Sequence, residues 1–511
     1  MKKTMLRILA MMLALLMALG TLSLVSCADD TEEEKTPDEQ TPEGDTPTDE
    51  EIPNEPQEER LSISYLPTTT YGGAQIHVLE WSANGQTDVG SGWIPWEDID
   101  VDTIEGDSLT SAIYDRNGAV EELYDVVITK EYVSVDGATN YSTVFRANES
   151  SGDEGYQMIT LRTADVAPFC LEGLMTDMNE LSYLHTQMPW WSQDSVKSYA
   201  MGNALYFAAP EMLLRDKGAA SLVFFNQKVA DDEGIEDLFE VARMGEWTVE
   251  MMIELSENVA ADLDGDDLIN SSDDMYGLFS NSRDLLHYLY MGSGNKFARV
   301  NEDGYVELTI GKEDNLMIWQ DILEDVLYTD FYFQNTVDPA LVPEGYDPFK
   351  ADRCLFFPSS VKTVLGLRDM SSAYGVLPIP KYDIYQEEYA SLVWMHHDCV
   401  LGIPGSCTNT DMISTVLEHM SYISYYDVYP IFYDTVILGK SARDEQSKQM
   451  LELVFKTRAV DPGMYLMVNE SWIFTVMHDN RVTNVASTWA SISSMFEARL
   501  KEINDKIDEL Q

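Results

Sequence analysis

The chain has few basic residues. Among its 511 residues are 32 lysines and arginines against 89 aspartates and glutamates, a formal net charge of −57 at pH 7. A surface with this balance repels nucleic acid and anionic membranes, so we expect no nucleic-acid partner. The same balance disfavours a strongly anionic ligand, unless a local basic pocket overrules it.

Cysteines are also few, and they do not form paired CxxC motifs, which excludes the usual structural zinc site. Four of the five are Cys170, Cys354, Cys399 and Cys407. Cys399 and Cys407 lie close enough in sequence to form a small-loop disulfide, which an exported location would permit. Two buried free thiols are at least as consistent with this spacing, and both alternatives stay open here.

Common catalytic motifs are missing as well. The sequence contains no GxSxG nucleophile elbow, no HExxH and no P-loop. Carboxylates are so abundant that some pair will always lie at glycosidase distance, which makes acid pairs uninformative. No period of 20–50 residues repeats, which excludes a solenoid or a propeller. We therefore expect a protein that is not an enzyme and needs no organic cofactor.

The N-terminus has a basic head and then an apolar run from Ile8 to Val25. This pattern, with small residues before a cut site, predicts a secretory signal peptide over residues 1–26. The run is also about long enough for an uncleaved transmembrane helix. Small and polar residues in its second half, among them Gly20 and Ser23, favour the signal peptide.

Cys27 ends the segment Leu24-Val25-Ser26-Cys27, which resembles the lipobox of bacterial lipoproteins. The resemblance implies a diacylglycerol on the Cys27 thiol and an acyl chain such as palmitate on the new N-terminus. Two or three acyl chains hold a protein on a membrane where one would not. We therefore expect a protein anchored to the extracellular face of a bacterial cell membrane.

Residues 27–60 are rich in Glu, Asp, Thr and Pro and nearly free of large apolar residues. Such a segment cannot bury enough apolar surface to fold, and we expect an acidic, disordered tether. About 450 residues follow, too many for one compact core, so we expect two lobes. Aromatic residues at 11% and apolar residues at 45% are ample for real cores.

Strand and helix patterns alternate through the first part of this region. Residues 75–81 read as a strand, 108–124 as a helix, and 125–129 and 156–161 as further strands. This alternation predicts a largely parallel α/β sheet. Further expected elements are strands over 204–211 and 222–226, a helix over 249–260 with Thr248 as its N-cap, and helices near 313–328, 410–424, 442–456 and 488–510.

Several short segments keep a shared order between residues 70 and 475. They are Tyr71-Gly72-Gly73, Ile113-Tyr114-Asp115-Arg116-Asn117, Trp190-Trp191-Ser192-Gln193, Gly202-Asn203-Ala204-Leu205-Tyr206-Phe207, Phe224-Phe225-Asn226-Gln227-Lys228, Glu246-Trp247-Thr248 and Tyr374-Gly375-Val376-Leu377-Pro378-Ile379-Pro380-Lys381. In this order the chain resembles the extracellular solute-binding lipoproteins of bacterial ABC transporters, of the carbohydrate type (family 1).

The resemblance implies a two-lobed fold of the type II periplasmic-binding-protein class, with a hinge and an interlobe cleft that closes over the ligand. It divides the folded part into four predicted stretches: residues 61–208 as the first part of lobe 1, 209–391 as the first part of lobe 2, 392–455 as a return to lobe 1, and 456–511 as C-terminal helices packing on lobe 2.

The implied function is capture of a carbohydrate or oligosaccharide and its delivery to the permease subunits of an ABC importer. We expect a monomer whose lipid anchor raises its effective concentration near that permease. Two alternatives stay open. One is a surface lipoprotein enzyme acting on glycans, such as a glycosidase. The other is a receptor for a peptide or another non-sugar solute, because the fold alone does not set the ligand.

Tryptophans are the first candidates for sugar contacts, because flat aromatic rings cover the apolar faces of sugars. Trp81 ends the first predicted strand, Trp93 and Trp96 follow in the next loop, and Trp394 precedes the second crossing. Aromatic residues are more often core than ligand platforms, and Trp247 is expected in the core.

Polar candidates lie at predicted strand ends and crossings, where open α/β sheets bind ligands. Arg162 and Thr163 end one strand, and Ser359 and Ser360 end another. The resemblance adds Glu211 after the first crossing strand. His396, His397 and Asp398 lie in the second crossing region. An ordinary hydrogen-bonded hinge explains these three equally well, and a metal site there would need further ligands.

A calcium loop is predicted over residues 262–273, which resemble the loop of dockerins and EF-hands. Its candidate oxygen ligands are the side chains of Asp262, Asp264, Asp266, Asn270 and Asp273 and the backbone of Leu268. Calcium takes six to eight oxygens, and alternate spacing wraps them around one ion. Asp267 stands where glycine is expected, and aspartate tolerates the left-handed backbone only moderately. The alternative is a solvated acidic turn; if calcium binds, we expect a structural role.

Overall fold

A computed structural model describes residues 60–82, 96, 98–101, 107–134, 140–280, 284–334, 347–434, 445–467, 476–477 and 480–510. All of them belong to the unit Arg60–Gln511. The predicted signal peptide, Cys27 and Trp93 lie outside the described residues, and so does the predicted tether except for Arg60. Within the described ranges, no helix combines the length and the apolar character that a membrane span requires.

The first lobe is built on a five-stranded sheet with the strand order β2-β1-β3-β15-β6. Its strands are β1 (Ala74–Ser82), β2 (Val126–Ser134), β3 (Met158–Leu161), β6 (Phe207–Ala208) and β15 (Val400–Gly402). The strands β2, β1 and β3 pair in parallel, as the alternating sequence pattern predicts. The strand β15 is antiparallel to both β3 and β6 and arrives from far along the chain.

The second lobe is built on another five-stranded sheet, with the order β11-β8-β12-β7-β13. Its strands are β7 (Ser221–Asn226), β8 (Tyr276–Ser280), β11 (Tyr332–Gln334), β12 (Cys354–Ser360) and β13 (Tyr374–Leu377). The strands β11, β8 and β12 are parallel, and β7 is antiparallel to β12 and β13. Each described residue of β7, β8, β12 and β13 is buried, as expected for strands covered on both faces.

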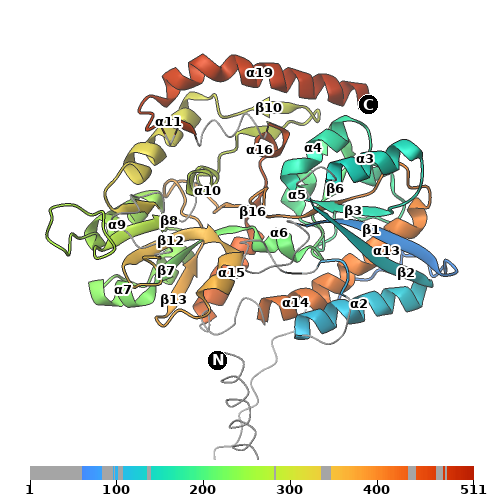
Figure 1. Ribbon diagram of the computed structural model, residues 1–511, viewed down its shortest axis with the longest axis horizontal. Helices are drawn as coiled ribbons and strands as arrows, with labels where there is room; N and C mark the ends of the chain where they lie inside the picture. The colour runs from blue at the N-terminus through green and yellow to red at the C-terminus, as the bar shows by residue number, and fades with distance from the viewer. Residues whose placement is uncertain are drawn as a thin grey trace, which may run out of the picture. The chain divides into compact units, whose positions relative to one another are not determined.

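The two sheets share one topology, and the antiparallel strand explains how the chain links them. In each sheet this strand is the first that the chain enters after crossing from the other lobe. The strand β7 follows the crossing over residues 209–220, and β15 follows the crossing over residues 378–399. The two crossings bond to each other, since Trp394 N–H donates to the Ala219 carbonyl at 3.1 Å. This arrangement confirms the predicted two-lobed α/β fold (Figure 1).

Helices cover both sheets. They are α2 (Ser108–Tyr124), α3 (Tyr141–Ser151), α4 (Thr163–Leu171), α5 (Gln193–Ser198), α6 (Leu214–Gly218), α7 (Gln227–Glu233), α8 (Leu238–Arg243), α9 (Val249–Val259), α10 (Leu285–Gly292), α11 (Glu313–Asp321), α12 (Val364–Leu367), α13 (Thr410–Ile423), α14 (Tyr429–Phe432), α15 (Glu445–Lys456), α16 (Pro462–Leu466) and α19 (Val485–Leu510). The π-helical segments η3 (Ile322–Leu327) and η5 (Ser424–Val428) extend α11 and α13.

Capping side chains explain where two predicted helices begin. Asp107 accepts a hydrogen bond from Thr110 N–H at the start of α2, and Thr248 accepts one from Met251 N–H at the start of α9. Such caps satisfy N–H groups that have no partner inside the helix. The predicted helix over 108–124 therefore coincides with α2, and Thr248 is confirmed as the N-cap of α9.

The C-terminal region is divided between the lobes differently from the predicted stretches. Within residues 392–455, β15 belongs to the first sheet, whereas α15 packs on β13 and α8 of the second lobe. After α15, β16 (Arg458–Ala459) pairs in parallel with β14 (Ser391–Leu392), which lies within the second crossing. The helix α19 packs on α11 and β10 (Val306–Leu308) of the second lobe and also contacts α4 of the first (Figure 1).

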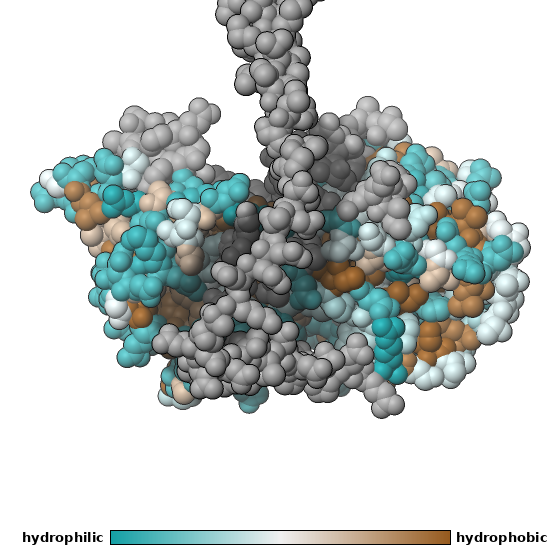
Figure 2. Space-filling model, turned by 90° about the horizontal axis from the view of Figure 1, so that it is seen from below, coloured by the Kyte–Doolittle hydropathy of each residue, from teal (hydrophilic) through white to brown (hydrophobic). Residues whose placement is uncertain are grey.

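Figure 2 shows the coloured surface from below. Hydrophilic residues dominate at the end that holds α7 and α9, and hydrophobic residues form separate patches toward the end that holds α2 and β2. Among the exposed apolar side chains are Tyr114, Leu123 and Val127 on α2 and β2. Trp247, expected in the core, is fully buried, and its indole N–H donates to the Pro378 carbonyl at 2.9 Å.

Candidate functional site

One strand end from each sheet meets the crossing segments. After β3, Ala164 N–H donates to the Met395 carbonyl at 3.0 Å, and after β12, Val361 N–H donates to the Ala220 carbonyl at 2.9 Å. Carboxyl ends of parallel strands are where open α/β sheets bind ligands. The meeting point of these ends with the crossings, which we call the lobe junction, is therefore the candidate ligand site.

Thr163 and Asp398 link the first lobe to the second crossing. Asp398 Oδ1 accepts from Thr163 N–H at 2.9 Å, and Asp398 Oδ2 accepts from the Thr163 hydroxyl. Burial raises the pKa of Asp398 to about 8, although the bonds from Thr163 act in the opposite direction. Both residues are buried, at 1% exposure each. Thr163 and Asp398 therefore hold the junction together.

Arg162 precedes Thr163 and is only partly buried. Its guanidinium pairs with Asp165, with 2.6 Å between Nη2 and Oδ2, and lies 5.6 Å from the centre of the Trp81 ring. Trp81 is 3% exposed, and Arg215 lies 5.4 Å from the same ring centre. Arg162 thus lies at the junction as predicted from its strand-end position, while Trp81 is packed beneath it.

Trp394 is also packed into the junction, at 3% exposure. Its ring centre lies 5.2 Å from that of His287, 6.1 Å from Tyr288 and 5.6 Å from His396. Trp96 is buried too and meets Phe432 edge-on at 4.8 Å. In this structure none of these tryptophans presents an exposed ring face of the size that a sugar would cover.

Glu211 does not leave its carboxylate free for a ligand. Lys217 Nζ lies 2.6 Å from Oε2, and Arg458 Nη2 lies 2.7 Å from Oε1. Burial alone would raise the pKa of Glu211, but the charges of Lys217 and Arg458 overcome it and lower the pKa to about 2. Arg458 also pairs with Asp216 at 3.2 Å. We call these four residues the hinge ion network, and Arg458 lies 247 residues from Glu211, too far for the network to be recognised from a motif.

Ser359 and Ser360 end β12 as predicted and are buried. The Ser359 and Thr363 hydroxyls lie 2.8 Å apart. Lys362 lies between them in sequence, in the 3-10 turn η4 (Val361–Thr363), and the sequence analysis missed it. Burial lowers the pKa of Lys362 to about 8, and Asp284 acts to raise it. A lysine two residues beyond a buried strand end was the available signal.

His396 and His397 are half-buried between these groups. Burial lowers both pKa values; Arg162 lowers that of His396 further, while Asp165 raises it. Lys362, His396 and Arg162 all lower the pKa of His397. The structure thus brings together Arg162, Thr163, Trp394 and His397 among the predicted residues.

The predicted calcium loop closes on itself. Asp262 accepts from the N–H groups of Gly265 and Asp267 at 2.6 and 2.7 Å, and Asp264 accepts from Asp266 N–H at 3.1 Å. Asp267 adopts the left-handed backbone, with φ at 66°, that the sixth position of such a loop requires. Leu268, whose carbonyl was the expected ligand, has an exposed side chain.

Three carboxylates of this loop gather, but the third is not the predicted one. Ligand oxygens of Asp262, Asp264 and Asp274 lie within 4.8 Å of one another. Asp274 is buried and accepts from Leu263, Asn270 and Ser271 N–H groups, whereas Asp273 is exposed. Carboxylate oxygens are the ligands that calcium prefers, so the donor set fits the ion.

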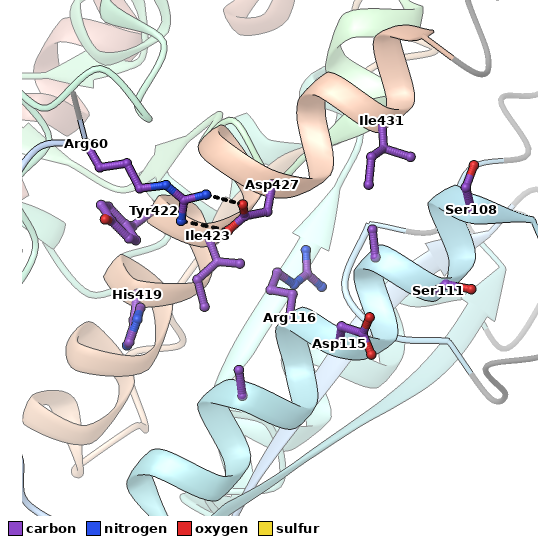
Figure 3. A pocket seen from close by; sticks show the side chains of 12 residues that line it. Arg60, Ser108, Ser111, Asp115, Arg116, His419, Tyr422, Ile423, Asp427 and Ile431 are labelled. Atoms are coloured by element: carbon purple, nitrogen blue, oxygen red, sulfur yellow. Dashed lines mark hydrogen bonds and ion pairs between the residues drawn. The ribbon is translucent and has the colours of Figure 1, made fainter. Parts of the chain in front are cut away.

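A cavity of about 760 Å³ lies elsewhere, between α2 and the run α13–η5–α14 (Figure 3). Its walls belong to the first lobe and to Arg60, so closure of the lobes would not reshape it. Arg60 pairs with Asp427 at 3.1 Å, and Arg116 donates to the Asp98 carbonyl and to Ser424 Oγ at 3.1 Å each. The arginines are thus already engaged, and we do not assign the ligand to this cavity.

The four described cysteines are free thiols and all are buried. The disulfide between Cys399 and Cys407 is therefore not formed, and the alternative of two buried thiols holds. Burial raises the pKa of Cys407 to about 11. Neither thiol is activated for chemistry at neutral pH.

No family model and no curated relative matches the chain. Solved structures do match its fold. A cyclo/maltodextrin-binding protein complexed with maltotetraose aligns at a TM-score of 0.51 and 10% identity, over 86% of this chain and 97% of that one. UspC of M. tuberculosis aligns at 0.50 and 13%, over 84% and 100%. A sugar transporter from Rhizobium etli, in an open conformation, aligns at 0.51 and 10%, over 86% and 100%. The chain therefore has the two-lobed fold of these proteins.

Proposed function

We propose that this chain is an extracellular solute-binding protein that captures a carbohydrate or oligosaccharide between its two lobes and delivers it to the permease of an ABC importer. The observation that carries the proposal is the lobe junction. Two sheets of one topology meet the crossing segments there, and backbone hydrogen bonds from the ends of β3 and β12 fix those segments in place.

Binding between two lobes couples recognition to closure. A ligand that contacts Arg162 from the first lobe and Lys362 from the second gains both contacts only when the lobes approach. The protein would act by binding and release, without a chemical step. The maltotetraose complex and the sugar transporter that share the fold support a carbohydrate as the solute class.

The anchor belongs to the same proposal. Lipidation at Cys27 would hold the mature protein on the outer face of the membrane, and the acidic segment would let it reach its permease. The proposed protein is a monomer. Calcium bound by Asp262, Asp264 and Asp274 would stabilise the loop at the far end of the second lobe and take no part in sugar binding.

The test is a thermal-shift screen of the purified protein against monosaccharides and oligosaccharides. A ligand at about one hundred times its Kd stabilises the folded state by about 2.7 kcal/mol, which raises the melting temperature measurably. The matched pair of variants is Arg162→Gln and Arg243→Gln, because each arginine pairs with a carboxylate three residues away at 2.6 Å. We expect only Arg162→Gln to reduce the ligand-induced shift.

Two results would contradict the proposal. One is a screen in which peptides shift the melting temperature and sugars do not. The other is release of reducing sugar from a glycan, lost on substitution of one carboxylate, since that result would make the protein a glycan-acting enzyme.

A further inference from the structure

The two lobes also touch each other directly, through a pair of small hairpins. In the first lobe, β4 (Ala200–Met201) and β5 (Ala204–Leu205) are joined by a turn at Gly202; in the second, β9 (Ala298–Val300) and β10 are joined by a turn at Gly304. Gly202 N–H donates to the Gly304 carbonyl at 2.9 Å. Neither hairpin belongs to a crossing or to a five-stranded sheet, so this contact is separate from the lobe junction.

Only glycine fits where the two turns meet. Gly304 has a φ of 83°, in the left-handed region that favours glycine, and a Cβ added there would overlap the backbone of Gly202. Both glycines are buried, although each lies at the tip of a turn. The two tips therefore cover each other, and no side chain separates the two backbones.

Polar contacts between the lobes flank the two turns. Lys296, just before β9, pairs with Asp194 of α5 in the first lobe, with 3.3 Å between Nζ and Oδ1. Asp194 Oδ2 also accepts from Val460 N–H at 2.8 Å, and the neighbouring Asp461 accepts from Phe297 N–H at 2.6 Å. The segment before α16 thus ties α5 of the first lobe to the start of β9 in the second. We call the two glycine turns and the Lys296–Asp194 pair the lobe clasp.

The helix α19 holds the second-lobe hairpin in place (Figure 1). The Asn504 side chain donates to the Val306 carbonyl and accepts from Val306 N–H, both at 3.0 Å. The Tyr305 hydroxyl donates to Asp508 at 2.6 Å, and Asn301 Oδ1 accepts from Tyr305 N–H at 3.0 Å inside the turn. Because the hairpin is bonded along its length, its tip cannot retreat locally when the other lobe moves.

The clasp therefore depends on how the lobes are arranged. A rotation of the lobes about their crossings moves the Gly202 turn relative to the Gly304 turn. Since the two backbones are already in contact, a closer approach makes them collide, and separation breaks their hydrogen bond. Packed interfaces of this kind switch between discrete arrangements and do not deform continuously.

We propose that the lobe clasp forms only in the lobe arrangement of this structure and must open before the lobes can rotate about their crossings. The clasp then acts as a conformational lock, which sets how much of the ligand-free protein occupies this arrangement. The inference goes beyond the proposed function, because it concerns the protein without ligand, and it rests on that function only for the response to a sugar.

The first test is made without ligand, on the full-length protein purified in detergent. The matched variants are Gly304→Ala and Gly234→Ala, because both glycines have a positive φ but a Cβ at Gly234 meets no atom within 4 Å. Both variants carry the same kind of backbone strain, and only Gly304→Ala forces the lobes apart at the clasp. By small-angle X-ray scattering, we expect a shifted radius of gyration for Gly304→Ala and the parent value for Gly234→Ala.

The second test locks the clasp with a reducible bismaleimide between introduced cysteines. The double variant Asp194→Cys with Lys296→Cys places them in different lobes, and Lys228→Cys with Asp232→Cys, at another ion pair, places both on α7. The four described native cysteines are buried, which protects their thiols from the reagent. We expect the cross-link between the lobes to abolish the sugar-induced change in the radius of gyration, reduction to restore it, and the cross-link on α7 to leave it unchanged.

The outcomes separate the clasp from the proposed function. An unshifted radius of gyration for Gly304→Ala, or a full response to sugar with the clasp cross-linked, would overturn the inference and leave sugar binding intact. If no sugar binds any variant but Gly304→Ala still shifts the ligand-free radius of gyration, the clasp stands and the proposed function fails.

Discussion

The hinge ion network should contribute strongly to stability, and Arg458→Met is the change that tests this. Arg458 is 8% exposed at its side chain and contacts Glu211 at 2.7 Å and Asp216 at 3.2 Å. Methionine keeps much of the volume and removes the charge. Two buried carboxylates then face Lys217 alone, and such an uncompensated arrangement costs about 3–5 kcal/mol.

The pKa of Glu211 supplies a second measure of the same quantity. Its pKa is about 2 in the folded chain against an ordinary 4.5, which corresponds to about 3 kcal/mol of stabilisation at neutral pH. Because the folded pKa is the lower one, this stabilisation is present above pH 4.5 and is lost as the pH falls toward 2. Replacing Arg458 removes part of this stabilisation of about 3 kcal/mol, which is similar in size to the cost of about 3–5 kcal/mol given above for losing the Arg458 charge.

The assay is urea-induced unfolding followed by tryptophan fluorescence at pH 7 and at pH 3.5. We expect Arg458→Met to lower the free energy of unfolding by about 3 kcal/mol at pH 7 and by clearly less at pH 3.5. Arg243→Met, at an exposed pair with Glu240, should change it by less than about 0.5 kcal/mol. A loss of less than about 0.5 kcal/mol for Arg458→Met at pH 7, or an equal loss at both pH values, would show that the hinge ion network does not stabilise the fold in this way.

Three further predictions concern other parts of the chain. Burial raises the pKa of Asp398 from 3.8 to about 8 in the folded chain, so the ionised carboxylate destabilises the fold increasingly as the pH rises from 4 to 8. Asp398→Asn should therefore be more stable than the parent at pH 8.5 but not at pH 4, as measured by urea unfolding. Calcium should raise the melting temperature of the parent and of Asp273→Asn but not of Asp264→Asn, and an absence of calorimetric calcium binding to the parent would reject the site. Cys27→Ala should move the protein from the membrane to the soluble fraction with unchanged sugar binding; retention on the membrane would contradict the proposed anchor.

Local signals in the sequence predicted the elements well. The helix over 108–124 coincides with α2 because Asp107 caps it and its apolar spacing is regular. Thr248 marks the start of α9 for the same reason. The resemblance supplied the two lobes, which the sheet topology confirms. The two helix starts depend on residues a few positions apart, and such local information can be obtained from a single sequence.

Contacts between residues far apart in the chain could not be predicted from the sequence. Glu211 was expected to face a ligand, but its partner Arg458 lies 247 residues away on β16, a strand that the sequence analysis did not predict. In the predicted calcium loop, too, the spacing of the residues did not predict which carboxylates come together. Spacing alone favoured Asp273, whereas backbone bonds from Leu263, Asn270 and Ser271 hold Asp274 beside Asp262 and Asp264.

The candidate ligand site was partly readable. Arg162, Thr163 and His397 were correctly placed near strand ends and crossings because these can be located from the sequence; that they bind the ligand stays a prediction. Trp81 and Trp394 were chosen for their type, and burial at 3% each shows that type alone does not separate a platform from a core residue. Lys362 was missed because its one local signal, a position two residues beyond the buried strand β12, does not show that its charge acts on His397 in the second crossing.

Closure of the two lobes on a carbohydrate can be measured by small-angle X-ray scattering of the purified protein, with and without a saturating oligosaccharide chosen by the thermal-shift screen. We expect a smaller radius of gyration in the presence of the sugar, an unchanged sugar after recovery, and no such compaction for Arg162→Gln at the same sugar concentration. An identical radius of gyration with saturating sugar, or recovery of a cleaved product, would contradict it.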